Sequence, residues 1–120
     1  MESRKNIGYY GERVAAKALM KRGYRLLEHN YTIRGGELDL ILEKGNELVF
    51  VEVKTRRNTH FGSPLESITP QKQRHLRRAA EVYLCSLPDA DRDIRFFAVA
   101  VILDDDDHVL RTEIYEDIFS

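Results

Sequence analysis

Two neighbouring segments of the chain alternate charged and apolar residues with a period of two, which is the pattern of β-strands. Residues 37–41 read ELDLI and residues 50–54 read FVEVK, and the letters KGN at 44–46 between them are typical of a hairpin turn. The pattern therefore predicts an antiparallel hairpin with strands at about 37–43 and 47–55.

The rest of the chain predicts two helices and three more strands. We place helices at residues 8–22 and from Pro70, after an N-cap at Thr69, to about Ser86, and strands at residues 24–31, 94–103 and 109–115. This order, αβββαββ, predicts an α/β fold in which a mixed β-sheet is flanked by helices. No repeat or linker divides the chain, so residues 1–120 are expected to form one domain.

The register of the hairpin brings two carboxylates face to face. If the turn has two residues, Lys44 pairs with Glu47, and counting outward places Asp39 opposite Glu52. Like charges at facing positions repel, and Lys54 shares their face of the sheet. A bound cation is the simplest remedy for this repulsion. The sequence therefore suggests a metal site at Asp39 and Glu52.

The apolar residues of the hairpin indicate that both of its faces are covered. One face is predicted to carry an apolar layer made of Leu38, Leu40, Leu42, Val49, Val51 and Val53. The other face carries the charged residues, with Ile41 and Phe50 beside them. A solvated face is the usual place for alternating charges, and that alternative stays open. Ionisable groups at the border of a core are costly unless they are paired or bound to a metal, which favours a site.

The first predicted helix supplies a third carboxylate. Glu12 lies inside the apolar stripe of Gly8, Ala15, Ala16 and Leu19. One interpretation is that Glu12 is directed from the helix towards the hairpin site. The alternative is a structural ion pair, or a rotation of the helix that exposes Glu12.

The charged residues are distributed unevenly along the chain. The net charge is −1, but residues 1–80 carry an excess of seven positive charges and residues 81–120 an excess of eight negative ones. This favours a basic face for an anionic partner such as nucleic acid, although a mixed surface charge or a merely solvated basic helix stays open. The candidate phosphate-binding residues follow the hairpin lysine or lie near the start of the second helix: Arg56, Arg57, Lys72, Gln73, Arg74, Arg77 and Arg78.

Composition excludes several other classes of protein. The longest apolar run, residues 96–103, is too short to span a membrane, and no apolar stretch opens the chain as a secretion signal would. The single cysteine, Cys85, cannot form an internal disulfide and suits a reducing cytosol. We therefore expect a cytoplasmic protein without a membrane partner. The sequence contains no glycine-rich nucleotide loop and no zinc-binding spacing of histidine or cysteine.

An Asp followed after twelve residues by Glu-x-Lys, with a Glu on a preceding helix, resembles the PD-(D/E)xK nuclease superfamily. The short sequence motifs around these residues are more specific. The letters GYYGE at 8–12, GELDLI at 36–41, FVEVKTR at 50–56 and KQR at 72–74 resemble, in this order, the YraN-like family of small bacterial endonuclease-like proteins. The similarity extends from Gly8 to the strand that contains residues 95–96.

The resemblance implies a restriction-endonuclease-like domain related to Holliday-junction resolvases. It makes Asp39 and Glu52 ligands of Mg²⁺ or Mn²⁺, Lys54 the lysine of the signature, and Glu12 a further catalytic and metal-binding carboxylate. Either Gln73 or Lys72 would line the site from the second helix. The implied activity is hydrolysis of DNA phosphodiester bonds, with branched or damaged DNA as candidate substrates.

This chain departs from the family pattern at two places. Leu38 stands where the superfamily often has Pro, and residues 95–98 read RFFA where the family usually shows RFDV. Two other functional classes remain open. One is a non-catalytic nucleic-acid-binding module of the same fold, and the other is an interaction protein with buried ion pairs.

Overall fold

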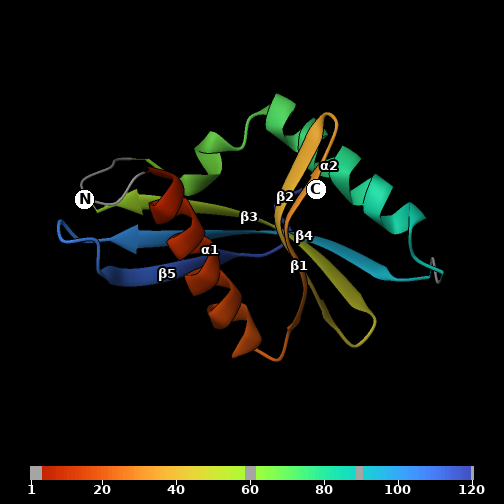
Figure 1. Ribbon diagram of the computed structural model, residues 1–120, viewed down its shortest axis with the longest axis horizontal. Coiled ribbons are helices and arrows are strands. Elements are labelled where there is room, and N and C mark those ends of the chain that lie inside the picture. The colour runs from red at the N-terminus through yellow and green to blue at the C-terminus, as the bar shows by residue number, and fades with distance from the viewer. Residues whose placement is uncertain (1–3, 59–61, 89–90, 120) are drawn as a thin grey trace.

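The computed structural model describes residues 4–58, 62–88 and 91–119, and the side chains from Ile7 onward. The helices are α1 (Arg4–Met20), the 3₁₀-helix η1 (Pro64–Ser67) and α2 (Pro70–Cys85). The strands are β1 (Arg25–Ile33), β2 (Gly36–Lys44), β3 (Glu47–Arg57), β4 (Asp93–Leu103) and β5 (Val109–Tyr115). The predicted order αβββαββ is confirmed (Figure 1). No helix in the described part of the chain is long and apolar enough to span a membrane.

The five strands form one mixed sheet in the order β1-β2-β3-β4-β5. Only β3 and β4 are parallel, because the long connection through η1 and α2 returns the chain to the same end of the sheet. The predicted hairpin is confirmed in its register, from Lys44 opposite Glu47 to Leu40 opposite Val51. Gly45 has a backbone φ of 59° in the turn, which glycine adopts at little cost.

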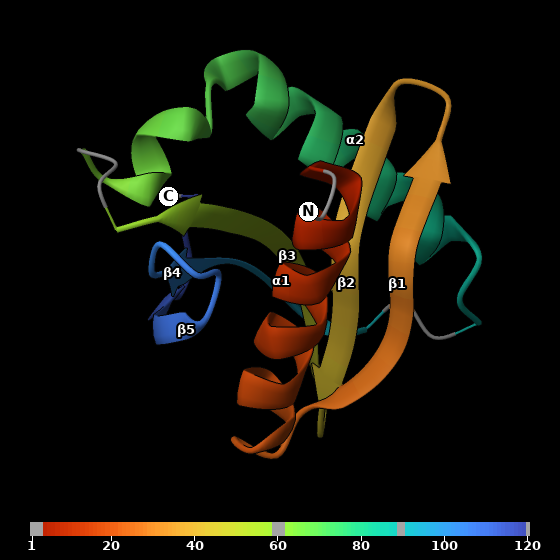
Figure 2. The ribbon, with the colours of Figure 1, turned by 60° about the vertical axis from the view of Figure 1, so that its left-hand side comes forward.

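The two helices lie on opposite faces of the sheet, so the molecule has three layers (Figures 1 and 2). The core under α1 contains Ala15, Ala16, Leu19, Leu40, Leu42, Val49 and Val51. The core under α2 contains Ile41, Phe50, Leu76, Ala79, Ala80 and Tyr83. The strands β2 and β3 are thus buried on both faces, as their mixed sequence pattern predicts.

The start of α2 is set by local chemistry. The hydroxyl of Thr69 accepts a hydrogen bond from the backbone N–H of Lys72, with 3.2 Å between the two atoms, and Pro70 occupies the first helical position. Both features were predicted. In contrast, α1 begins at Arg4, four residues before the predicted start, because its first turn carries no apolar stripe that a periodic pattern could reveal.

The predicted position of Leu38 is wrong. Strict alternation puts Leu38 on the face of Leu40, but Leu38 packs in the cluster under α2 together with Ile41. The ladder between β2 and β3 ends at Leu40 and Val51, and beyond this point the two strands diverge (Figure 2). Alternation holds only while a strand keeps its neighbours, so it fails where β2 leaves β3.

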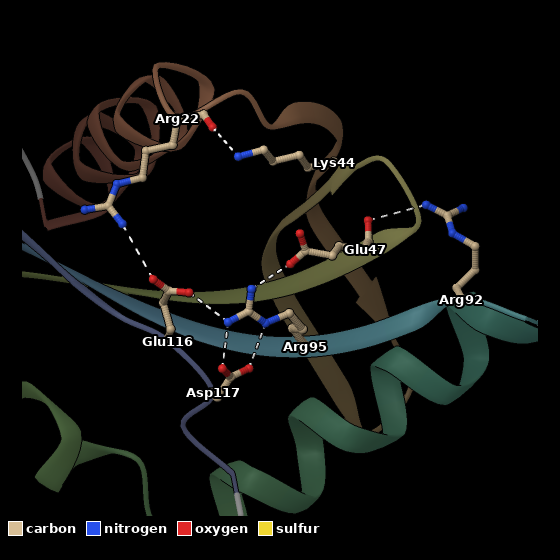
Figure 3. A network of polar contacts seen from close by, with 7 residues as sticks. All are labelled: Arg22, Lys44, Glu47, Arg92, Arg95, Glu116 and Asp117. Carbon is tan, nitrogen blue, oxygen red and sulfur yellow. Dashed lines mark hydrogen bonds and ion pairs between the residues drawn. The ribbon is translucent and has the colours of Figure 1, made fainter.

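The segment after β5 is fastened to the sheet by Arg95 of β4 (Figure 3). Its guanidinium group forms ion pairs with Glu47 at 2.6 Å, Glu116 at 2.7 Å and Asp117 at 2.6 Å. Arg22 reaches Glu116 from the end of α1, at 3.8 Å. Part of the acidic excess in residues 81–120 is therefore neutralised within the fold. This network lies at the start of β3 and β4, away from the end of β3 that carries the candidate site.

Candidate metal centre

The candidate site begins where β2 and β3 separate. Leu40 and Val51 are the last pair of the ladder, and Asp39 and Glu52 are the next residues beyond this pair on the two strands. Asp39 is 7% exposed and Glu52 is 3% exposed, and they are the only buried polar or charged residues in the part of the chain that the structure describes. Burying two neighbouring carboxylates is costly, so their surroundings must compensate for it.

Asp39 is held by the backbone of the neighbouring strand. Its Oδ2 atom accepts a hydrogen bond from the N–H of Val53, with 2.7 Å between the two atoms. Burial, and then the negative charge of Glu52, raise the pKa of the Asp39 carboxyl from 3.8 to about 8, although the Val53 hydrogen bond acts in the opposite direction. Near neutral pH, Asp39 therefore carries a proton for much of the time unless a cation replaces it.

Glu52 is compensated by two lysines. Its Oε1 atom lies 3.4 Å from Nζ of Lys54 on the same strand and 3.0 Å from Nζ of Lys72 on α2. Burial alone would lower the pKa of Lys72, but the ion pair with Glu52 outweighs it and the net shift is upward. Of the two α2 residues that were predicted to line the site, Lys72 reaches Glu52, whereas the side-chain amide of Gln73 donates to the carbonyl of Ile68 at 3.4 Å.

Both carboxylates open onto a cavity of about 360 Å³ between α1 and the end of β3. Glu12 and Lys54 also line this cavity. Burial and the neighbouring carboxylates Glu37 and Glu52 raise the pKa of Glu12, against a hydrogen bond from Asn30. The structure thus brings together the four residues that were predicted to form the catalytic site.

The three carboxylates do not converge closely on one point. In the described residues, the only three acidic or histidine side chains with ligand atoms within 4.8 Å of one another are Asp104, Asp106 and His108, in the exposed turn after β4. Glu12 therefore lies in the same cavity as Asp39 and Glu52, but not within direct reach of an ion that both of them bind.

The donor set of the cavity fits a hard cation such as Mg²⁺. The Val53 N–H donates to Oδ2 of Asp39, and the two lysines contact Oε1 of Glu52. The cavity thus offers carboxylate oxygens from two strands, and oxygen ligands suit Mg²⁺ and Mn²⁺.

Two residues of this region were missed by the sequence interpretation. Gly11 lies where α1 packs on β3, and a Cβ atom there would be 1.7 Å from the hydroxyl oxygen of Thr55. Asn30 lies across from Asp39 in the register of β1 and β2, with a φ of 52°. Both had a sequence signal, since Gly is costly inside a helix and Asn is uncommon in strands. Neither the glycine in the helix nor the asparagine in the strand shows from the sequence which contact requires it.

The predicted phosphate-binding residues fall into two groups. Arg56 donates to the carbonyl of Gly62, with 2.5 Å between the atoms, and Arg57 forms an ion pair with Asp107 at 2.7 Å, so both are engaged within the fold. The α2 residues Arg74, Arg77 and Arg78 are exposed. The guanidinium group of Arg77 lies 4.6 Å from the ring centre of Phe119, and Arg78 donates to the carbonyl of Arg34 at 3.3 Å.

The fold and the site define an α/β protein with a mixed five-stranded sheet, one helix layer on each face and a buried pair of carboxylates beside two lysines. This arrangement is consistent with a restriction-endonuclease-like architecture. The sequence model of the uncharacterised protein family UPF0102 matches residues 11–101, and the chain belongs to this family. Membership confirms the resemblance to YraN-like proteins.

Curated relatives cover most of the chain. A UPF0102 protein of Syntrophomonas wolfei is 48% identical over 101 residues, which are 84% of this chain and 88% of the relative. UPF0102 proteins of Moorella thermoacetica and Dictyoglomus turgidum are 43% and 41% identical, and each alignment covers at least 96% of both chains.

Proposed function

We propose that this protein is a divalent-cation-dependent nuclease that hydrolyses phosphodiester bonds in DNA. The observation that carries the proposal is the buried pair of Asp39 and Glu52. These residues lie just beyond the point where two central strands separate, and they line one cavity together with Lys54. A pair of buried carboxylates lowers the stability of the fold, and a role in binding a cation explains why such a pair is present.

Mg²⁺ or Mn²⁺ would be held by the carboxylates of Asp39 and Glu52. When bound, the ion supplies a Lewis acid for the phosphate and lowers the pKa of a coordinated water. Glu12 faces the same cavity without reaching both strand carboxylates, so it suits the orientation of water better than direct ligation.

Lys54 is the residue with the most direct role beside the carboxylates. Its side chain is partly exposed and lines the cavity, so its ammonium group can stabilise negative charge that develops on the phosphate in the transition state. Lys72 approaches Glu52 from α2, 3.0 Å away, and its ion pair fixes the glutamate. We therefore assign Lys72 as a positioning residue.

The exposed arginines of α2 support a nucleic acid as the substrate. Arg74 and Arg78 are exposed on the same helix that brings Lys72 to Glu52, and their spacing of four residues places them on one face of α2. Arginine side chains spaced along a helix suit contacts with backbone phosphates, which position a nucleic acid without reading its sequence.

A non-catalytic nucleic-acid-binding module is the second candidate function. The observation that favours it is the contact of both lysines with one oxygen of Glu52. Two positive charges beside two carboxylates compensate the buried pair without a cation. In this alternative the carboxylates and lysines have a structural role only, and DNA binding needs no metal.

Cleavage assays separate the two functions. Supercoiled plasmid, single-stranded DNA and branched DNA are incubated with the wild type in Mg²⁺, in Mn²⁺ and in EDTA, beside Asp39→Asn. Asp39→Asn keeps an acceptor for the Val53 N–H and removes one anionic ligand. Metal-dependent cleavage by the wild type that Asp39→Asn lacks supports the nuclease. DNA binding without cleavage, equal in EDTA and in both proteins, supports the binding module.

A further inference from the structure

A second cavity adjoins the carboxylate site. It has a volume of about 500 Å³ and lies between α1 and the strands β1 and β2. Its inner wall is apolar and includes Ala16, Leu26 and Leu40. Glu12 lines this cavity and the carboxylate cavity alike, so the two cavities adjoin at this side chain.

Most of the polar residues that line this cavity are exposed. His29 and Asn30 of β1 are both exposed, with 3.3 Å between Nδ1 of His29 and Nδ2 of Asn30. Tyr9 and Arg13 of α1 also line the cavity and are exposed. The cavity thus combines apolar walls with a few donors and acceptors, a combination typical of pockets for small molecules.

We propose that this cavity receives an unpaired nucleobase of the nucleotide next to the phosphate held at Asp39 and Glu52. The proposal rests on the proposed function and defines its substrate class: nucleic acid in which at least one base at the cleavage position is unpaired. Regular duplex is a poor substrate, because a paired base cannot leave its stack without a free-energy cost.

Size, chemistry and position together favour a base over other occupants. The cavity lies within the volume range of pockets for small ligands and is too small for a folded partner. Its apolar walls can cover the faces of a base, while His29 and Asn30 can bond to the base edge. Because the two cavities share Glu12 as a lining residue, a base and its adjoining phosphate can occupy both at once.

The test uses DNA with 2-aminopurine at one position, either unpaired in a bulge or paired in a matched duplex. Fluorescence is titrated with protein in EDTA, which measures base binding without cleavage. Ala16→Leu fills the cavity from α1, and Leu26→Phe fills it from β1. Ala18→Leu is the matched control, because it makes the same change on the same helix and does not line the cavity. Melting temperatures show that each variant is folded.

We expect the wild type and Ala18→Leu to change the fluorescence of the bulged base but not of the paired one. Each cavity-filling variant should bind the bulged DNA at least about ten-fold more weakly, in the range typical of the loss of one base-stacking contact. In Mg²⁺, the wild type should cut bulged DNA faster than the matched duplex, and the filling variants should lose this preference.

The outcomes distinguish the two proposals. If bulged and matched DNA are cut equally fast and the filling variants behave as the wild type, the base cavity is refuted while the nuclease stands. If nothing is cut but the fluorescence response is present and sensitive to filling, the base cavity stands and the nuclease is refuted. A bulged base whose fluorescence does not respond to the protein overturns the base cavity whatever the cleavage result.

Discussion

The carboxylate of Asp39 takes the place of a β-ladder partner for Val53. The ladder of β2 and β3 ends at Leu40 and Val51, two residues before Val53, and the N–H of Val53 donates instead to Oδ2 of Asp39 at 2.7 Å. One hydrogen bond therefore satisfies the backbone near the point of strand separation and fixes the orientation of the acid. A buried carboxylate that is held in this way beside the charge of Glu52 has consequences for pH dependence, metal binding and stability.

The metal-free protein should become less stable as the pH rises. The folded-state pKa of Asp39, about 8, exceeds its unfolded value near 3.8, so between these values the folded state holds a proton that the unfolded state has lost. The free energy of unfolding should fall across this window. The total fall is about 1.4 kcal/mol for each unit by which the folded-state pKa of Asp39 exceeds its unfolded-state pKa. Glu12, whose pKa is also raised, acts in the same direction.

Urea unfolding of the wild type and Asp39→Asn in EDTA, from about pH 5 to pH 8.5, measures this dependence. Asp39→Asn should reduce the pH-dependent fall in the free energy of unfolding by at least about 1 kcal/mol. A difference of one unit between the folded-state and unfolded-state pKa of Asp39 already corresponds to about 1.4 kcal/mol. Asp106→Asn changes an exposed acid in the turn after β4 and should keep the wild-type slope. A wild type whose stability is flat or rises over this range would contradict the assignment.

Divalent cations should stabilise the protein more at high pH than at low pH. A cation must displace the proton of Asp39, so its apparent affinity rises with pH up to about the pKa of that group. Millimolar Mg²⁺ or Mn²⁺ should raise the melting temperature of the wild type at about pH 8.5, raise it less at about pH 6, and leave Asp39→Asn unchanged.

The exposed cluster of Asp104, Asp106 and His108 provides the control for metal binding. Asp106→Asn should keep the metal-induced shift of the wild type. If Asp106→Asn loses the shift and Asp39→Asn keeps it, the cation binds at the turn and not between β2 and β3.

Lys54 and Lys72 should differ in what their loss changes. Both contact Oε1 of Glu52, at 3.4 and 3.0 Å, but only Lys54 lines the cavity. Lys54→Ala should lower the cleavage rate by at least about 100-fold while the metal-induced melting shift is kept. Lys72→Ala should lower stability by about 1–3 kcal/mol, since a buried charge loses a partner, and should reduce cleavage less. Full cleavage by purified Lys54→Ala removes that lysine from the mechanism.

Two glycines of α1 form a matched pair for testing how the helix sits on β3. A Cβ atom at Gly11 would lie 1.7 Å from Oγ1 of Thr55, whereas a Cβ atom at Gly8 meets nothing within 4 Å. Gly11→Ala should destabilise the fold by about 1–3 kcal/mol through overpacking. Gly8→Ala should stabilise it by about 0.5–1 kcal/mol, because alanine is the better helix former. Equal effects of the two substitutions in urea unfolding would show that α1 does not approach β3 this closely.

The sequence predicted those parts of the site that depend on local pattern. The turn at Gly45 and strict alternation on each side set the hairpin register, which counting predicts correctly as far as Leu40 and Val51. The start of α2 also follows from the local sequence, because the hydroxyl of Thr69 accepts a hydrogen bond from an N–H only three residues later. The period-two rule fails at Leu38, where β2 loses β3 as its neighbour.

Contacts between residues far apart in the chain could not be read in this way. The pairing of Arg57 with Asp107 joins positions 50 residues apart and was not predicted. Periodicity put Gln73 on the inner stripe of α2, but it is the longer Lys72 side chain that reaches Glu52. Such contacts depend on where the tertiary fold places each helix, which no local pattern encodes.

The exposed arginines of α2 should give the protein a salt-dependent affinity for DNA of any sequence. Contacts to backbone phosphates release counterions, so each one contributes about 0.9 to the slope of log affinity against log salt on duplex DNA. Arg74→Gln/Arg78→Gln removes two exposed charges and should lower that slope by up to about 1.8. Arg77 is left in place because its guanidinium group packs over Phe119, and its loss would confound binding with stability.

The matched control, Lys17→Gln/Lys21→Gln, removes two exposed charges from α1 and the turn that follows it and should leave the slope unchanged. Fluorescence anisotropy with two unrelated duplexes over a range of salt measures both pairs. If the two double variants weaken binding equally, the affinity reflects overall charge and α2 does not form the DNA-binding surface.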